Sequence, residues 1–92
     1  MPRPIPARRH QAINHVADLI GNDIVTTHEI WEMGQALIAS GAKWPPYTKQ
    51  AFKSFRTTTA LGNMMSRHPD WGKVGDKAVR IGGIRTQLWQ RR

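Results

Sequence analysis

The chain has 92 residues and no cysteine, and its 14 Lys and Arg against six Asp and Glu give a formal net charge of +8. This length predicts one domain, and the lack of cysteine excludes disulfides and thiolate zinc sites. No apolar run approaches the roughly 20 residues that span a bilayer. The N-terminus has no apolar core of a signal peptide, so we expect a cytoplasmic or nucleoid-associated protein.

The positive charge is confined to the C-terminal half of the chain. Residues 1–46 carry four basic and four acidic residues, whereas residues 47–92 carry ten basic residues against Asp70 and Asp76. One-sided positive charge of this kind is typical of a protein that binds a polyanion. Nucleic acid is therefore the expected partner. Anionic lipid is less favoured, because no basic helix with a large apolar face is evident.

The N-terminal part predicts an arm and a helix. Residues 1–6 are rich in proline and predict an extended arm, although Pro6 also suits the first position of a helix. Residues 7–20 predict a helix, because their apolar side chains recur at helical spacing. Gly21 ends it, since glycine tolerates the left-handed conformation.

A short strand and a second helix follow. Ile24 and Val25 suit a short strand that pairs with a distant part of the chain. Thr26 and Glu29 have the spacing of a capping box, in which each side chain accepts a hydrogen bond from the backbone of the other residue. The helix that they start is expected to run to about Ala39.

A loop and two shorter helices come next. Residues 42–48 contain two prolines and cannot continue a helix, and we expect Trp44 and Tyr47 to fold back on the core. Residues 48–56 predict a short helix. Residues 58–67 predict a longer one, which follows a run of threonines that can cap it.

The C-terminal segment changes to the alternating period of strands. Gly82 and Gly83 separate two such runs and suit the primed turn of a hairpin. Gly75 and Asp76 predict a bulge or a second turn in the first strand. The pattern assigns five side chains to one face, but only imperfectly, because the register across the turn is unknown. These are Val79, Ile81, Ile84, Thr86 and Leu88.

The predicted fold is mostly α with a C-terminal β-hairpin, of the α+β class, in one domain over residues 7–92. The run from ALGNMMSRHPDWGKV to VRIGGIRTQLWQRR resembles the recognition helix and wing of winged helix-turn-helix domains. More narrowly, VTTHEIWEMG, ALGNMM and the hairpin ending in LWQ are similar to the C-terminal winged-helix domain of phage and plasmid replicative primase–helicases. The resemblance implies three to four helices plus a wing. It also implies double-stranded DNA binding by a transcriptional regulator or a replication or mobile-element factor.

No catalytic constellation is evident, and we expect neither an enzyme nor a bound cofactor or metal. The run HEIWE at residues 28–32 lacks the second histidine of the HExxH zinc motif. The scattered histidines do not have metal-ligand spacing. Glu29 and Glu32 are better explained as cap and surface residues of a helix.

The helix over residues 58–67 is the expected recognition helix, the element that contacts the bases of DNA. Leu61, Met64 and Met65 share one face, which we expect to lie in the core. The other face carries side chains that can form hydrogen bonds in the major groove of DNA. These candidate base-contacting residues are Thr58, Thr59, Asn63, Ser66 and Arg67.

Two basic groups are expected to contact the DNA backbone on either side of that helix. The first lies on the short helix before it and consists of Lys49, Lys53 and Arg56. The second lies on the hairpin and consists of Lys73, Lys77, Arg80 and Arg85. Arg85 is beside the turn and is the best candidate for a minor-groove or phosphate contact.

Other partners stay open at this point. A phage-type protein-interaction module or inhibitor would set its basic face against an acidic protein. Structured RNA presents the same phosphates as DNA. A homodimer is also compatible with the sequence.

Overall fold

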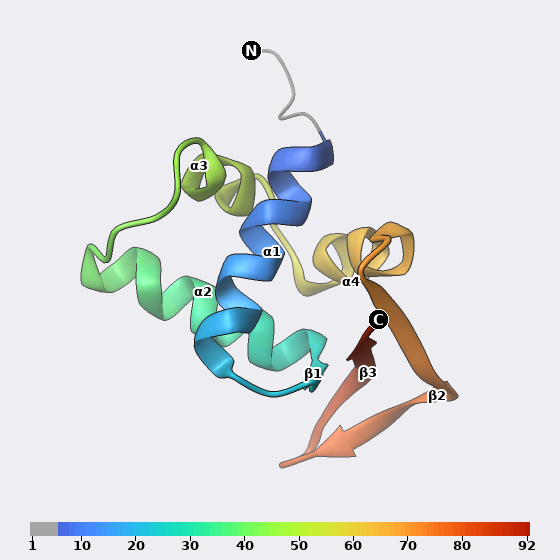
Figure 1. Ribbon diagram of the computed structural model, residues 1–92. Helices are drawn as coiled ribbons and strands as arrows, with labels where there is room; N and C mark the ends of the chain where they lie inside the picture. The colour runs from blue at the N-terminus through green and yellow to red at the C-terminus, as the bar shows by residue number, and fades with distance from the viewer. Residues whose placement is uncertain (1–5) are drawn as a thin grey trace.

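The computed structural model describes residues 6–92, and the side chains of all of these except residues 6, 76 and 77. Within this range the chain forms an α+β domain with four helices and a three-stranded antiparallel sheet (Figure 1). The elements are α1 (Pro6–Ile20), β1 (Ile24–Thr26), α2 (Thr27–Ser40), α3 (Thr48–Lys53), α4 (Thr58–Arg67), β2 (Trp71–Ile81) and β3 (Ile84–Arg91). None of these helices is long and apolar enough to cross a membrane.

The first helix begins one residue earlier than predicted, at the last residue of the expected extended arm. Pro6 is the first residue of α1, where its missing N–H costs no helical hydrogen bond. The rest of the arm, residues 1–5, lies outside the described part of the chain.

Strand β3 lies in the middle of the sheet, in the order β1-β3-β2. β1 pairs with it antiparallel, with Val25 opposite Trp89. β2 pairs with its other edge and begins with Trp71 opposite Arg91. The short strand predicted to pair with a distant part of the chain therefore pairs with the last strand.

Glycines shape the hairpin formed by β2 and β3. Gly82 and Gly83 have φ angles of 58° and 82°, which are the left-handed values that a primed turn requires. Gly75 has a φ of 77°, and the register of β2 against β3 shifts between Val74 and Val79. The predicted irregularity near Gly75 is thus confirmed as a bulge.

Threonine side chains cap the N-termini of two helices, α2 and α4. The Thr26 hydroxyl accepts a hydrogen bond from the Glu29 N–H, and the Glu29 carboxylate accepts one from the Thr26 N–H, both at 3.0 Å. The predicted capping box is therefore confirmed. The Thr57 hydroxyl caps α4 by accepting from the Ala60 N–H at 3.1 Å. Gly41, with φ of 73°, ends α2.

The hydrophobic core lies between the helices and one face of the sheet. Leu61 and Met65 are fully buried, as predicted for the inner face of the helix, and Met64 packs against the core in part. The buried apolar residues are Ala12, Ile13, Val16, Ala17, Val25, Ile30, Ala51, Phe52, Phe55, Leu61, Met65, Trp71 and Trp89.

The prediction that Tyr47 packs on the core is wrong. Its side chain is 68% exposed. The guanidinium carbon of Arg8 lies 4.1 Å from the centre of its ring, so a cation–π contact covers the ring in place of the core. Trp44, from the same loop, does pack against the core in part.

The short helix predicted over residues 48–56 ends early, at Lys53. The Ser54 hydroxyl donates to the Ala51 carbonyl, and the Phe55 N–H donates to the Phe52 carbonyl at 3.0 Å. These bonds close a tighter turn, and Phe55 beyond it is buried. Arg56 therefore does not share a helical face with the lysines of α3.

His68 is buried at the end of α4, with 2% of its surface exposed. Its Nδ1 accepts from the Asp70 N–H at 3.1 Å, so its Nε2 carries the proton and donates to the His10 carbonyl, also at 3.1 Å. This pattern satisfies the neutral ring completely. Burial accordingly lowers the pKa of His68 below its ordinary value of 6.5.

The buried histidine predicts a loss of stability in mild acid. The unfolded chain takes up a proton at His68 near its ordinary pKa of 6.5, whereas the folded chain resists that proton. We therefore expect the free energy of unfolding to fall as the pH drops from about 7.5 to about 5.5. Urea unfolding across this range should show a flatter dependence in His68→Gln than in the wild type. The partly exposed His28→Gln serves as control, and an equal slope in all three proteins would contradict the prediction.

Two glycines with opposite surroundings give a second prediction. A Cβ on Gly34 would lie 2.1 Å from the Phe52 ring, whereas a Cβ on Gly62 would lie 3.8 Å from its nearest neighbour, Thr27 Cγ2. We expect Gly34→Ala to destabilise the fold by roughly 1–3 kcal/mol through overpacking. Gly62→Ala should raise stability by up to about 1 kcal/mol through helix propensity. Thermal or urea unfolding measures both, and destabilisation of the two variants by the same amount would contradict this packing.

Candidate nucleic-acid interface

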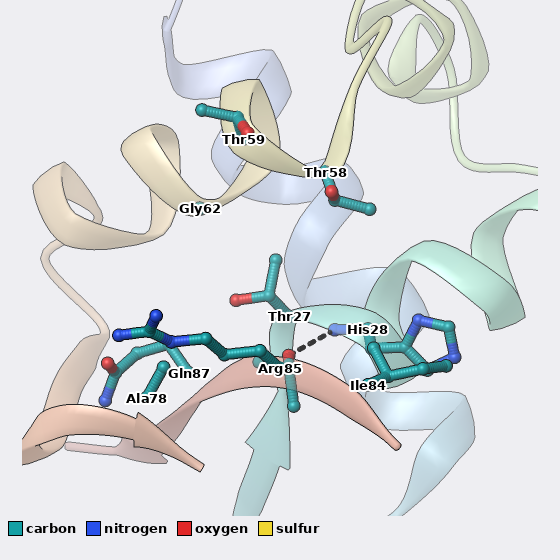
Figure 2. Close-up of a pocket in the computed structure, with 10 residues that line it drawn as sticks. Thr27, His28, Thr58, Thr59, Gly62, Ala78, Ile84, Arg85 and Gln87 are labelled. Carbon is teal, nitrogen blue, oxygen red and sulfur yellow. Dashed lines mark hydrogen bonds between the residues drawn. The ribbon is translucent and has the colours of Figure 1, made fainter. Parts of the chain in front are cut away.

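A groove runs between α4 and the β2–β3 hairpin, beside the first residues of α2 (Figure 2). Two adjoining hollows share Thr59, Gly62 and Gln87, so together they form one continuous surface, here named the α4–hairpin groove. Its α4 wall consists of Thr58, Thr59, Gly62, Asn63 and Ser66. Its hairpin wall consists of Lys73, Ala78, Ile84, Arg85, Thr86, Gln87 and Trp89, and Thr27 and His28 lie between the walls at one end.

The α4 wall is polar and accessible. Thr58, Thr59 and Asn63 are exposed. The Ser66 hydroxyl is exposed too but donates to the Asn63 carbonyl at 2.7 Å, so it offers a partner mainly its acceptor lone pairs. Four of the five residues predicted to contact bases thus line one wall of one groove. The fifth, Arg67, is exposed at the end of α4 and does not line it.

Gly62 lies at the centre of this wall and has no packing reason to be glycine. A Cβ there would be in ordinary contact with Thr27 and would clash with nothing. Its backbone is helical, so no left-handed conformation requires glycine either. Because Gly62 has no side chain, a molecule bound in the groove can approach the backbone of α4 closely at this position.

The hairpin wall carries positive charge on the sheet face that looks toward α4. Lys73 lies opposite Trp89 and Arg80 lies opposite Arg85, and opposite residues in an antiparallel pair share a face. Arg85 and Trp89 share that face as well, because side chains alternate along a strand. Lys73 and Arg85 line the groove, whereas Arg80 shares their sheet face but does not line it, and all three are exposed.

The pairing of Arg80 with Arg85 opposes like charges, which destabilises a hairpin. Neither arginine has a carboxylate within salt-bridge distance among the residues whose side chains are described. No Asp or Glu lines the groove within that same set of residues. An anion bound in the groove would relieve this repulsion.

Two hydrogen bonds hold the end of the groove in place. Trp89 donates from its indole nitrogen to the Thr27 hydroxyl at 2.8 Å, in a buried contact. The His28 N–H donates to the Thr86 hydroxyl at 3.0 Å, the dashed bond in Figure 2. These bonds attach the start of α2 to β3, so they set the position of the hairpin relative to the helices.

Sequence reasoning missed Gln87, which lines both parts of the groove. Its side-chain amide donates to the Val74 and Leu88 carbonyls at 3.1 and 3.2 Å, beside the bulge. A signal was present, because Gln87 is a polar residue two positions from Arg85 in a strand and so shares its face. Thr27 and His28 had no such signal, since their place in the groove depends on tertiary contacts.

The basic residues on and after α3 lie elsewhere. Lys53 and Arg56 line a separate hollow with Trp31 and Phe55, between α2 and the end of α3. Lys49 is partly buried. Figure 1 places α3 on the far side of α1 from the hairpin. The structure therefore does not bring this basic group to the α4–hairpin groove, and the side chain of Lys77 lies outside the described residues.

Comparison of the chain with known protein families, with curated proteins and with solved structures gives no match. The function is therefore inferred from the fold and the groove themselves. They define a small α+β protein with a groove that has one polar helical wall and one strand wall carrying Lys73 and Arg85.

Proposed function

We propose that the protein binds double-stranded DNA in the α4–hairpin groove, in the manner of a winged helix-turn-helix domain. In this proposal α4 enters the major groove and the β2–β3 hairpin acts as the wing on the flanking backbone. The observation that carries it is the opposition of a polar helix face and a basic sheet face, with no described carboxylate lining the space between them.

The order of the elements supports this arrangement. A winged helix has its wing hairpin directly after the recognition helix, and here β2 begins four residues after the end of α4. The major groove of B-DNA is about 12 Å wide and admits one α-helix. The exposed face of α4 supplies five residues to the groove, whereas α2 supplies only Thr27 and His28 at one end, so α4 is the element proposed to enter.

Each side chain in the groove has a chemistry that suits one part of the duplex. The Asn63 amide matches the paired donor and acceptor of adenine, and the methyl groups of Thr58 and Thr59 can contact the thymine methyl. Lys73 and Arg85 offer cationic donors to phosphate oxygens. This division assigns sequence reading to α4 and sequence-independent affinity to the hairpin. Two biological roles fit this proposal, a transcriptional regulator and a replication or mobile-element factor. The DNA sites that the protein binds would distinguish between them.

Matched charge removals test where the duplex binds. We expect Lys73→Ala and Arg85→Ala each to weaken binding to every duplex and to reduce the slope of log K against log salt by about 0.9. Lys53→Ala and Arg56→Ala are the controls, because they remove the same charges from exposed residues outside the groove. Fluorescence anisotropy over a salt series measures all four variants. Equal losses in the two pairs would point to diffuse attraction by net charge and contradict a specific groove.

A selection experiment tests sequence reading by α4. Wild-type protein is expected to enrich a defined site from a random duplex pool, in the presence of RNA and single-stranded DNA competitors. Asn63→Ala should then lose about 1–3 kcal/mol of discrimination at one base position. Gln50→Ala, which removes an exposed amide from α3, should keep it. Enrichment of structured RNA, or a stable complex with an acidic protein and no duplex binding at low salt, would replace the proposal with one of those partners.

A further inference from the structure

The end of the β2–β3 hairpin projects beyond the three-stranded part of the sheet (Figure 1). β1 pairs with β3 from Leu88 to Gln90, at the far end of that strand from the turn. Thr86 is buried and accepts a hydrogen bond from the start of α2 at 3.0 Å. Beyond this anchor the described chain is a two-stranded ribbon over residues 80–85, which we name the hairpin tip.

Two isoleucines are the outermost side chains of the hairpin tip. Ile81 lies opposite Ile84, and the turn between them consists of two glycines that add no side chains. The two isoleucines are 54% and 42% exposed, and they are two of the five large hydrophobic residues that are exposed in the described chain. Because they lie opposite each other, they form one small apolar point at the end of a narrow ribbon.

Two arginines lie directly behind this apolar point. Arg80 lies opposite Arg85, and both are exposed. Neither has a carboxylate within salt-bridge distance among the residues whose side chains are described. The sequence from Lys77 to the C-terminus contains no Asp or Glu. The hairpin tip thus combines an apolar end with two cations that lack acidic neighbours, and this combination suits a partner with an anionic outside and an apolar interior.

The hairpin tip is continuous with the α4–hairpin groove. Ile84 and Arg85 line that groove, and Figure 2 shows both on the strand below α4. Their partners across the hairpin, Ile81 and Arg80, lie just beyond it. A duplex held in the groove would therefore extend over the tip. DNA has the required chemistry, since phosphates cover its outside and stacked bases form its interior.

We propose that the hairpin tip inserts Ile81 and Ile84 into the minor groove of the bound duplex and separates two stacked base pairs there. This inference rests on the proposed function and adds a deformation that binding alone does not require. Aliphatic side chains that enter the minor groove often act as wedges between base steps and kink the duplex. Burial of the isoleucines offsets part of the cost of unstacking. Arg80 and Arg85 would then contact the phosphates beside the kink.

The dimensions of the hairpin tip are compatible with this insertion. Its two residue pairs extend about 7 Å along the strands, and the minor groove of B-DNA is about 7.5 Å deep. Adjacent strands lie about 5 Å apart, close to the groove width of about 6 Å, so side chains enter only where the groove opens at a kink.

The wedge also predicts the kind of DNA site. Pyrimidine–purine steps, which are TA and CA/TG, are kinked and unstacked most easily. Sites selected from a random duplex pool should therefore contain such a step within about one helical turn of the bases that α4 contacts.

The bend of a selected duplex tests the wedge. Energy transfer between dyes at the two duplex ends reports the bend, and a fluorescent adenine analogue at the predicted step reports unstacking. Wild-type protein should bend the duplex by about 20° or more and brighten the analogue. Ile81→Thr and Ile84→Thr, singly and together, keep the strand propensity of isoleucine. The double variant should leave the duplex straight and weaken binding about tenfold. The salt slope should stay unchanged, because no charge is lost.

Two control variants separate the wedge from general effects on the fold. Ile81→Leu combined with Ile84→Leu keeps two aliphatic side chains at the tip and should keep the bend. Leu19→Gln changes a side chain that is 52% exposed on α1 and lies outside the groove, so the bend and the affinity should both stay as in the wild type.

The outcomes distinguish this inference from the proposed function. A protein that binds no duplex overturns both. A duplex that the wild-type protein binds straight and fully stacked overturns the wedge and leaves binding in the groove intact. A bend that survives in the threonine double variant also overturns the wedge. If the threonine variants instead lose self-association in sedimentation equilibrium and keep the bend, the isoleucines contact a second copy of the chain, and the wedge is wrong.

Discussion

The fold depends on the central position of β3, the last strand of the chain. β3 pairs with β1 on one edge and with β2 on the other, and its Trp89 and Thr86 bond to the first residues of α2. These contacts join residues about 60 positions apart in the sequence, so they cost considerable chain entropy to form. The result is a hairpin held at a fixed place beside α4, and the groove exists because of that placement.

The hairpin carries positive charge beside α4 that the described part of the chain leaves unbalanced. The face toward α4 is basic, and it retains Arg80 and Arg85 as a like-charged pair that no described acidic side chain neutralises. The opposite face is aliphatic and uncharged at its paired positions.

Local signals in the sequence predicted the elements well, and tertiary contacts decided what they left open. The capping box of Thr26 and Glu29 and the left-handed glycines of the turn follow from interactions within a few residues. The face chosen by Val79, Ile81 and Leu88 does not, because a slip of one residue would move every side chain to the other face. The Gly82–Gly83 turn sets Ile81 opposite Ile84, but the shift of register between Val74 and Val79 and the pairing of Leu88 with Thr26 could not be foreseen from that turn. The places of Thr27 and His28 in the groove likewise depend on neighbours that are remote in sequence.

The measurement that most directly tests the central claim is amide chemical-shift mapping of the ¹⁵N-labelled protein with a selected duplex. The account predicts that the largest shifts fall on the outer face of α4, from Thr58 to Ser66, and on the hairpin strands at Lys73 and from Arg80 to Gln87. The α3 segment and the hollow beside Trp31 should change little. Shifts concentrated on α3 and Trp31, or on Ile24 of β1, would contradict it.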